Sequence, residues 1–406
     1  MTDFTLVYYS GDRKTGSIAL VRRSNGETSV TAMDNAPESG LAKELKPIMI
    51  GMTGDEHVVL LDPRTKQLTF DKSFPGDAFP AHIYPDPDST RDWFMNDGDK
   101  ETGNDTLNCG DGGSSVTVVD NADSADARYL ATICVGRGHH QAAFSYPGDA
   151  VPDVPRQAYI SNLKDGTISV IGNDPDKPDS YLKVVATIDL CEPDKEKNPG
   201  ENNAFPHGLV YSVLSGKVYN LNNGYGTIAV IDPHTHKIEE RIGLKGFSNL
   251  FISPNGRYIL GRGADRKSDP NHVIARLAVI DVKTNGIVST RDLPDIYISK
   301  YYFNPEGTRL YLTTSSKGSP EQVANLKDDV LLVFDMTALP EIKLISELRV
   351  GDSGSLSFLY NDGRTEMVLS SDSAGGAVVA IDADGTNIIE SISVGKPMSH
   401  SRVWLI

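Results

Sequence analysis

One strand pattern returns eight times along the chain, and this repeat constrains the fold more than any other feature. Each copy is a small or glycine residue followed by a short aliphatic, β-branched run that often ends in aspartate. The copies are GSIALV (16–21), HVVLLD (57–62), SSVTVVD (114–120), GTISVIG (166–172), GTIAVID (226–232), RLAVIDV (276–282), DVLLVFD (329–335) and GAVVAID (376–382). Repeats of about 40–60 residues that each hold several short strands are typical of β-propellers, in which one sheet forms one blade.

Further strands flank these copies. A second strand precedes several of them, as in AYISN (158–162) and LYLTT (310–314), and another follows, as in VVATIDL (184–190). The first strand of a unit ends in a turn such as SPNG (253–256), NPEG (304–307) or YNDG (360–363), where glycine supplies a positive φ. Because helical periodicity is not sustained anywhere, we predict an all-β chain that forms a single β-propeller domain over residues 1–406.

The two ends of the chain complement one another. The segment SRVWLI (401–406) has the pattern of an innermost strand without followers, whereas TLVYYS (5–10) and SIALVRR (17–23) have the pattern of followers without an innermost strand. Pairing them in one shared blade closes the ring and removes two exposed sheet edges. We therefore expect eight blades. Seven is the alternative, because the unit around KPIMIGM (46–52) has no clear innermost strand.

Charge and hydropathy narrow the possible partners. The formal net charge is −16 and no basic cluster stands out, so a nucleic-acid partner is not expected. No run of 18 apolar residues indicates a transmembrane helix, and no membrane partner is expected. The first residues lack the pattern of a secretory signal, which predicts a cytoplasmic protein. A shortened mature form of an exported, periplasmic protein would have the same appearance.

The three cysteines, Cys109, Cys134 and Cys191, have no metal-type spacing. Their odd number argues against a disulfide framework. We expect each to be a small buried side chain or a loop thiol.

The chain resembles the YVTN-type propeller superfamily through GTISVI, GTIAVID, SPNGRYILG and NPEGTRLYLTT. That superfamily is similar to the haem-binding propeller of dissimilatory nitrite reductase and to the propeller of nitrous oxide reductase. It includes copper-dependent thiocyanate dehydrogenase and some periplasmic zinc chaperones. The resemblance covers almost the whole chain and implies the fold more strongly than an activity.

Histidines gather at one place in the repeat. Five of the nine lie at or just before the start of an innermost strand: His82, His139, His140, His207 and His400. The matching positions of later blades hold Ser248, Ser299 and Ser355. In a propeller these starts open on one face together with the loops between second and third strands, which here are long and polar. Four or five imidazoles are therefore expected around one mouth of the central channel.

This arrangement predicts a metal site, with copper favoured over zinc, because converging imidazoles suit either ion. His82, His140, His207 and His400 would be ligands, and His139 a further ligand or a hydrogen-bond partner of one. Asp97 or Asp265 would act as base. Lys164, Arg262 or Arg402 would hold substrate charge, and Arg137 and Lys300 also flank the mouth. The predicted function is a copper-dependent oxidoreductase that acts on a small, possibly anionic molecule.

Other interpretations stay open. Each histidine could simply cap backbone groups at a strand start. The protein could carry or store zinc or copper without turnover, or it could be a protein-interaction scaffold without metal. Non-covalent haem is a less favoured cofactor, since no C-x-x-C-H attachment motif is present. The sequence leaves the substrate and the oligomeric state undetermined.

Overall fold

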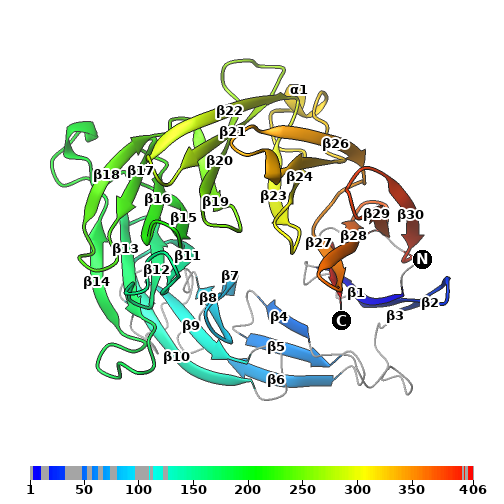
Figure 1. The fold of residues 1–406 in the computed structure, drawn as a ribbon, viewed down its shortest axis with the longest axis horizontal. Helices are drawn as coiled ribbons and strands as arrows, with labels where there is room; N and C mark the ends of the chain where they lie inside the picture. The colour runs from blue at the N-terminus through cyan, green and yellow to red at the C-terminus, as the bar shows by residue number, and fades with distance from the viewer. Residues whose placement is uncertain are drawn as a thin grey trace.

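A computed structural model of the chain describes residues 3–10, 18–32, 48–52, 57–62, 67–73, 80–96, 109, 113–121, 127–395, 397 and 401–405. The predicted all-β architecture is confirmed. The strands in this part of the chain form seven four-stranded antiparallel sheets and one three-stranded sheet. In Figure 1 the sheets follow one another around a common centre, as in a β-propeller.

The first and last strands of the chain share one sheet, as their sequence patterns predict. β31 pairs antiparallel with β1, and Val403 lies opposite Tyr8. From the axis outward, this terminal sheet consists of β31 (Ser401–Leu405), β1 (Phe4–Ser10), β2 (Ile18–Ser24) and β3 (Glu27–Ala32).

The three-stranded sheet contains the unit whose innermost strand was unclear from the sequence. Its strands are β4 (Ile48–Met52), β5 (His57–Asp62) and β6 (Gln67–Ser73). Residues 33–47, which precede β4, lie outside the described part of the chain.

The other sheets each use four consecutive strands, and the first of each four lies nearest the centre (Figure 1). Two of them are β7 (Pro80–Pro85), β8 (Arg91–Asn96), β9 (Ser114–Asp120) and β10 (Arg128–Val135), then β11 (His139–Ser145), β12 (Gln157–Asn162), β13 (Thr167–Gly172) and β14 (Val184–Asp189). Two more are β15 (Pro206–Ser212), β16 (Lys217–Asn222), β17 (Thr227–Ile231) and β18 (Ile238–Gly243), then β19 (Phe247–Ile252), β20 (Tyr258–Asp265), β21 (Ile274–Asp281) and β22 (Gly286–Pro294).

The last two are β23 (Ile298–Phe303), β24 (Arg309–Thr314), β25 (Val330–Asp335) and β26 (Lys343–Arg349), then β27 (Leu356–Asn361), β28 (Arg364–Asp372), β29 (Ala377–Asp382) and β30 (Ile388–Ser393). The helical segments in the described residues are short: η1 (Pro193–Lys195), α1 (Pro320–Val323) and η2 (Met336–Ala338). None of these helices is long and apolar enough to cross a membrane.

Aromatic rings join neighbouring sheets. Trp93 of β8 is fully buried and its ring centroid lies 5.5 Å from that of Phe144 on β11. Farther round the ring, Phe251 of β19 stacks on Tyr301 of β23 at 4.3 Å. Such pairs contribute beyond the burial of their apolar area. The core therefore lies between the faces of adjacent sheets, and it fixes how each innermost strand is presented to the axis.

The predicted turns are confirmed. Gly256, Gly307 and Gly363 close SPNG, NPEG and YNDG, and each has a positive φ, between 67° and 80°. In the SPNG turn the N–H of Gly256 donates to the carbonyl oxygen of Ser253. An L-residue with a side chain would be strained in this conformation, which explains the glycine.

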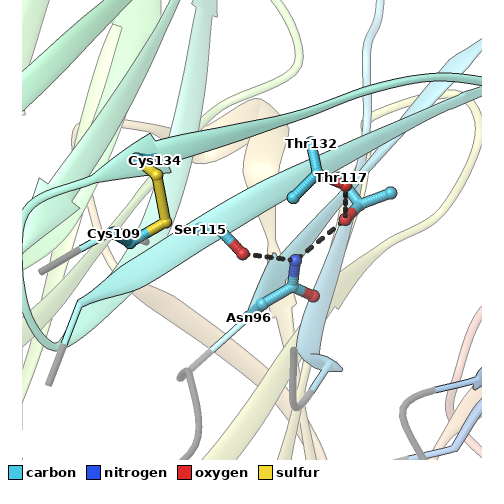
Figure 2. The surroundings of a disulfide bond; sticks show 6 residues. All are labelled: Asn96, Cys109, Ser115, Thr117, Thr132 and Cys134. Atoms are coloured by element: carbon cyan, nitrogen blue, oxygen red, sulfur yellow. Dashed lines mark hydrogen bonds between the residues drawn. A yellow bond between two sulfur atoms is a disulfide. The ribbon is translucent and has the colours of Figure 1, made fainter. Parts of the chain in front are cut away.

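The expectation that the cysteines stay unpaired is wrong for two of them. Cys109 and Cys134 form a disulfide, with Cα atoms 5.1 Å apart, while Cys191 is free. Figure 2 shows that the bond ties the segment before β9 to the outer strand β10. An odd number of cysteines excludes complete pairing only, so it could not exclude this single bridge.

Candidate functional site

Several innermost strands have a β-bulge near their start, and this bulge determines which of their residues occupy equivalent positions around the axis. β7, β11, β15, β19 and β23 each have a register shift just after their first residue. One extra residue in a strand bends it and changes the direction of neighbouring side chains. Positions along these strands must therefore be compared from the pairing, not from the sequence alone.

The pairing gives a common reference point in three sheets. Pro80, His139 and Pro206 are opposite the last residues of their second strands, Asn96, Asn162 and Asn222 respectively. The amide of Asn96 donates to Ser115 and Thr117 (Figure 2), and the amide of Asn162 donates to Thr167 and Ser169 in the same way. We call the opposing residue the first position of each innermost strand, and the next two residues its second and third positions.

The candidate metal ligands occupy three different positions in this frame. His139 is at a first position, His140 and His207 are at second positions, and His82 is at a third position. Ser248 and Ser299 match His207, as the sequence predicts. His82 does not match it and lies one residue farther along its strand, because Ala81 takes the second position.

The side chains of only two of these histidines are described. His82 is exposed and its ring centroid is 6.3 Å from that of Tyr84, while His207 is half-buried. The side chains of His139 and His140, and all of His400 and Asp97, lie outside the described residues. Within the described part, no group of three or more histidine, cysteine, aspartate or glutamate side chains could hold a metal ion. The two described imidazoles supply fewer donors than a zinc or copper site needs.

The third positions bring together side chains of a different kind. The N–H groups of Gln141 and Lys300 donate to Ser161 and Thr313, the corresponding hydroxyls of their second strands, and Ser355 donates to Ser371 likewise. The third-position residues are His82, Gln141, Gly208, Asn249, Lys300 and Ser355.

Arg402 completes this set in the terminal sheet. The N–H of Leu209, which follows Gly208, donates to Oε1 of Gln141 in the preceding sheet at 2.7 Å. The N–H of Val403, which follows Arg402, donates to Oγ of Ser355 in the same manner at 2.8 Å. Arg402 is therefore equivalent to Gly208, and it is the third-position residue of the terminal sheet.

Lys300 and Arg402 are close enough to interact electrostatically. Burial and, to a smaller extent, the neighbouring Arg402 guanidinium together lower the pKa of the Lys300 ammonium to about 8. Sheet β27–β30 lies between their strands (Figure 1). Nη1 of Arg402 donates to the carbonyl oxygen of Gly354 at 2.7 Å, and no carboxylate of the described residues forms an ion pair with Arg402.

Arg262 is a third cation beside the channel. It lies on β20 opposite Asn249, and its Nη1 donates to the carbonyl oxygen of Ile298 at 2.6 Å. Its Nε is buried and has no hydrogen-bond partner among the described residues. Burial lowers the pKa of Arg262. In the described part of the chain, neither Lys300, Arg262 nor Arg402 forms an ion pair with a carboxylate.

Two tyrosines of innermost strands influence each other electrostatically. Burial raises the pKa of Tyr84 on β7, and the proximity of Tyr301 on β23 acts in the same direction. Burial also raises the pKa of Tyr301. This pair was not predicted from the sequence, because alternation along a strand does not reveal which side chains of distant strands come near each other.

The structure describes three further residues that the sequence places near the mouth. Lys164 is exposed in the turn between β12 and β13, and Arg137 forms an ion pair with Asp165 at 2.7 Å. Asp265 accepts hydrogen bonds from Ser268 and from the N–H of Lys267, and these bonds lower its pKa to about 2. The Asp265 carboxyl is therefore ionised at neutral pH.

Neither a protein-family model nor a curated protein matches the sequence. Solved structures do match. AztD from Citrobacter koseri is 12% identical with a TM-score of 0.57, and the match covers 100% of this chain and 98% of that chain. The periplasmic gluconolactonase PpgL from Pseudomonas aeruginosa is 13% identical with a TM-score of 0.56, covering 99% of each chain.

A protein from Lactobacillus plantarum is 12% identical with a TM-score of 0.56, covering 99% of this chain and 100% of that chain. At these identities the likeness shows the fold alone. It supports a β-propeller superfamily in general and does not single out the YVTN-type propellers that the sequence resembles.

Proposed function

We propose that this protein binds a small anionic molecule at the axial channel, held by Lys300, Arg402 and Arg262. One observation carries the proposal: these cations lie beside the axis without a carboxylate partner in the described residues. Removing a cation from bulk water without a counter-ion costs free energy. An anion at the channel would offset that cost and bind more strongly than at the exposed surface.

Lys300→Met and Arg402→Met test this proposal. The probes are small anions of increasing size, from phosphate and sulfate to citrate, and binding is measured by isothermal titration calorimetry. Each lost charge-assisted hydrogen bond should weaken binding by about tenfold or more. Lys217→Met is the matched control, because Lys217 is also half-buried but has its own carboxylate partners. Binding that is equal in all four proteins would contradict the proposal.

A metal site near the first and second positions is the second candidate function. The observation that favours it is that His140 and His207 hold the same position on β11 and β15, two innermost strands that contact one another. With His82, His139 and His400 they would form the site, with copper favoured over zinc. Asp97 or Asp265 as base and Lys164 as a substrate contact belong to this proposal, which includes turnover as an oxidoreductase, carriage without turnover, or a bound haem.

Elemental analysis tests the metal site directly. The protein is purified without an affinity metal and compared with His140→Ala, His207→Ala and His400→Ala. His234→Ala serves as the control, since His234 lies in the exposed turn after β17. About one equivalent of copper or zinc that is lost in the three variants would support the site. Metal far below one equivalent in every protein would exclude it.

The disulfide bears on the compartment. Disulfides persist in oxidising surroundings and are rare in the reducing cytosol. We therefore propose that the protein works outside the cytosol, as a periplasmic or secreted protein. Separately, we propose that sheet β4–β6 is one of eight blades. Mass spectrometry after alkylation in intact cells should find Cys109 and Cys134 protected.

A further inference from the structure

A polar cavity is lined by loops of sheets β15–β18 and β19–β22 and by Tyr297 just before β23, at the same end as the start of β19. We call it the loop cleft. It has a volume of about 860 Å³ and is bounded by the β16–β17 turn, the β18–β19 connection and the β20–β21 loop. Its lining residues are Asn223, Gly224, Tyr225, Gly226, Lys245, Gly246, Phe247, Ser248, Ala264, Asp265, Arg266, Lys267, Arg276 and Tyr297.

The charge of the loop cleft is opposite to that of the protein. Four of its lining residues are cations and only Asp265 is a carboxylate, whereas the whole chain has a net charge of −16. Asp265 is already bound to Arg276 at 3.0 Å and to the hydroxyl of Ser268 at 2.6 Å. No carboxylate of the described residues forms an ion pair with Lys245, Arg266 or Lys267. Anions are therefore attracted to this cleft from an otherwise repelling surface.

Aromatic rings stand beside these charges. The guanidinium of Arg266 lies over the ring of Tyr297, 5.8 Å from its centroid. Tyr297 is half-buried and also lies under the ammonium of Lys317 at 5.5 Å, and the half-buried Tyr225 and Phe247 line the cleft beside it. A flat ring of a ligand would find apolar and π surfaces here, next to cations that could hold its charged groups.

Gly246 has a φ of +87°, a conformation in which a residue with a side chain would be strained. The segment that lines the cleft before β19 therefore requires glycine at this position.

We propose that the loop cleft is a binding site for a small molecule with at least two anionic groups and a ring. A volume of about 860 Å³ is within the usual range for small-molecule sites. Lys245, Arg266 and Lys267 contact the anionic groups, because Arg276 is already paired with Asp265 and Asp292. The aromatic residues that line the cleft contact the ring. This site uses none of the three channel cations, so it stands or falls separately from anion binding in the channel.

Calorimetric titration with four probes tests the loop cleft. A nucleoside diphosphate and benzene-1,3,5-tricarboxylate carry both charge and ring, inorganic pyrophosphate carries charge alone, and the neutral nucleoside carries the ring alone. The first two should bind most tightly and the neutral nucleoside should not bind. If neither ring-bearing anion binds at millimolar concentration, the proposal is wrong.

Two double variants locate the binding. Lys245→Met with Lys267→Met should weaken both ring-bearing anions by about tenfold or more. Lys237→Met with Lys283→Met is the matched control, because it removes two exposed lysines outside the cleft and should leave binding unchanged. Equal weakening in both double variants would show a general charge effect and overturn the proposal.

Lys300→Met separates this site from the channel. It should leave the titrations with ring-bearing anions unchanged if they bind in the loop cleft. If Lys300→Met abolishes their binding and the Lys245/Lys267 pair does not, the anions bind in the channel. That result would refute the loop cleft while supporting the proposed function.

Discussion

Lys217 and Lys300 are both half-buried lysines on β-strands, but their surroundings shift the ammonium pKa in opposite directions. Burial alone would lower the pKa of Lys217, yet ion pairs with Asp232 at 2.6 Å and Glu239 at 2.8 Å raise it above its usual value. At Lys300 burial and Arg402 act together and lower the pKa to about 8. Lys217 is thus compensated by carboxylates, whereas no carboxylate of the described residues forms an ion pair with Lys300.

This difference distinguishes cations that stabilise the fold from cations that are available to bind a ligand. A buried ion pair that is fully hydrogen-bonded holds elements of the fold together. A cation without a counter-ion contributes nothing of this kind, and its persistence beside a channel favours a role in binding. The contrast can be tested in four ways, which we give from the largest expected effect to the smallest.

Among the carboxylates that pair with a buried cation, Asp86 should have the largest effect on the free energy of unfolding when it is replaced. It is 3% exposed, lies 3.4 Å from Nη2 of Arg91, and accepts a 2.7 Å hydrogen bond from Asn173 in the next sheet. Asp86→Asn should lower the free energy of unfolding by about 3–5 kcal/mol, because it leaves a buried guanidinium without its partner. Urea denaturation measures the loss. A change below about 1 kcal/mol would show that such pairs do not hold neighbouring sheets together.

Anion binding at the channel should depend on pH in a way set by Lys300. As pH rises through about 8 the ammonium loses its proton, so affinity for a small anion should fall by about tenfold. Lys300→Arg keeps its charge at high pH and should remove this dependence. Titrations between pH 6.5 and about 9.5 compare the two proteins. The same pH profile in both would mean that another group controls binding.

Lys300→Met should raise the free energy of unfolding by about 1 kcal/mol at pH 7, because it removes an uncompensated, partly desolvated charge. The folded pKa lies below the unfolded value of 10.5, so between about 8 and 10.5 the unfolded chain binds more protons and the native protein gains stability with rising pH. The advantage of the variant should therefore shrink over that range. Chemical denaturation at pH 7 and pH 10 checks both statements, and a destabilised variant would contradict them.

Lys217→Met should have the smallest effect and the opposite sign. Because its ion pairs are partly exposed, the variant should lower the free energy of unfolding by about 0.5–1 kcal/mol at pH 7. It should leave anion binding unchanged. The same denaturation series measures it. A gain in stability here, equal to that of Lys300→Met, would remove the distinction between the two lysines.

Much of the fold could be predicted from the repeat. The strand copies, the glycine turns and the pairing of SRVWLI with TLVYYS are local patterns or direct consequences of closing a ring, and the structure confirms them. The candidate site was harder to predict. His82 and His207 differ by one position although β7 and β15 have the same bulge, because the residue at which each innermost strand begins to pair is not visible in a short, irregular strand start.

Contacts between residues far apart in the chain could not be predicted from the sequence pattern. The disulfide joins residues 25 positions apart, and a count of three cysteines could not show which two would meet. Lys300 was recognised as flanking the mouth, but its lack of an ion pair with any described carboxylate was not. The ion pairs of a lysine depend on which side chains neighbouring strands bring beside it.

The sequence by itself determined that this protein is a ring of antiparallel sheets joined through its ends, because alternation, turns and repeat length act over a few residues or over one regular period. Only the tertiary structure decided which cations near the axis form no ion pair with the carboxylates that the structure describes, and which loops line a cleft. These properties arise from side chains of different sheets, and their approach is set by packing and register.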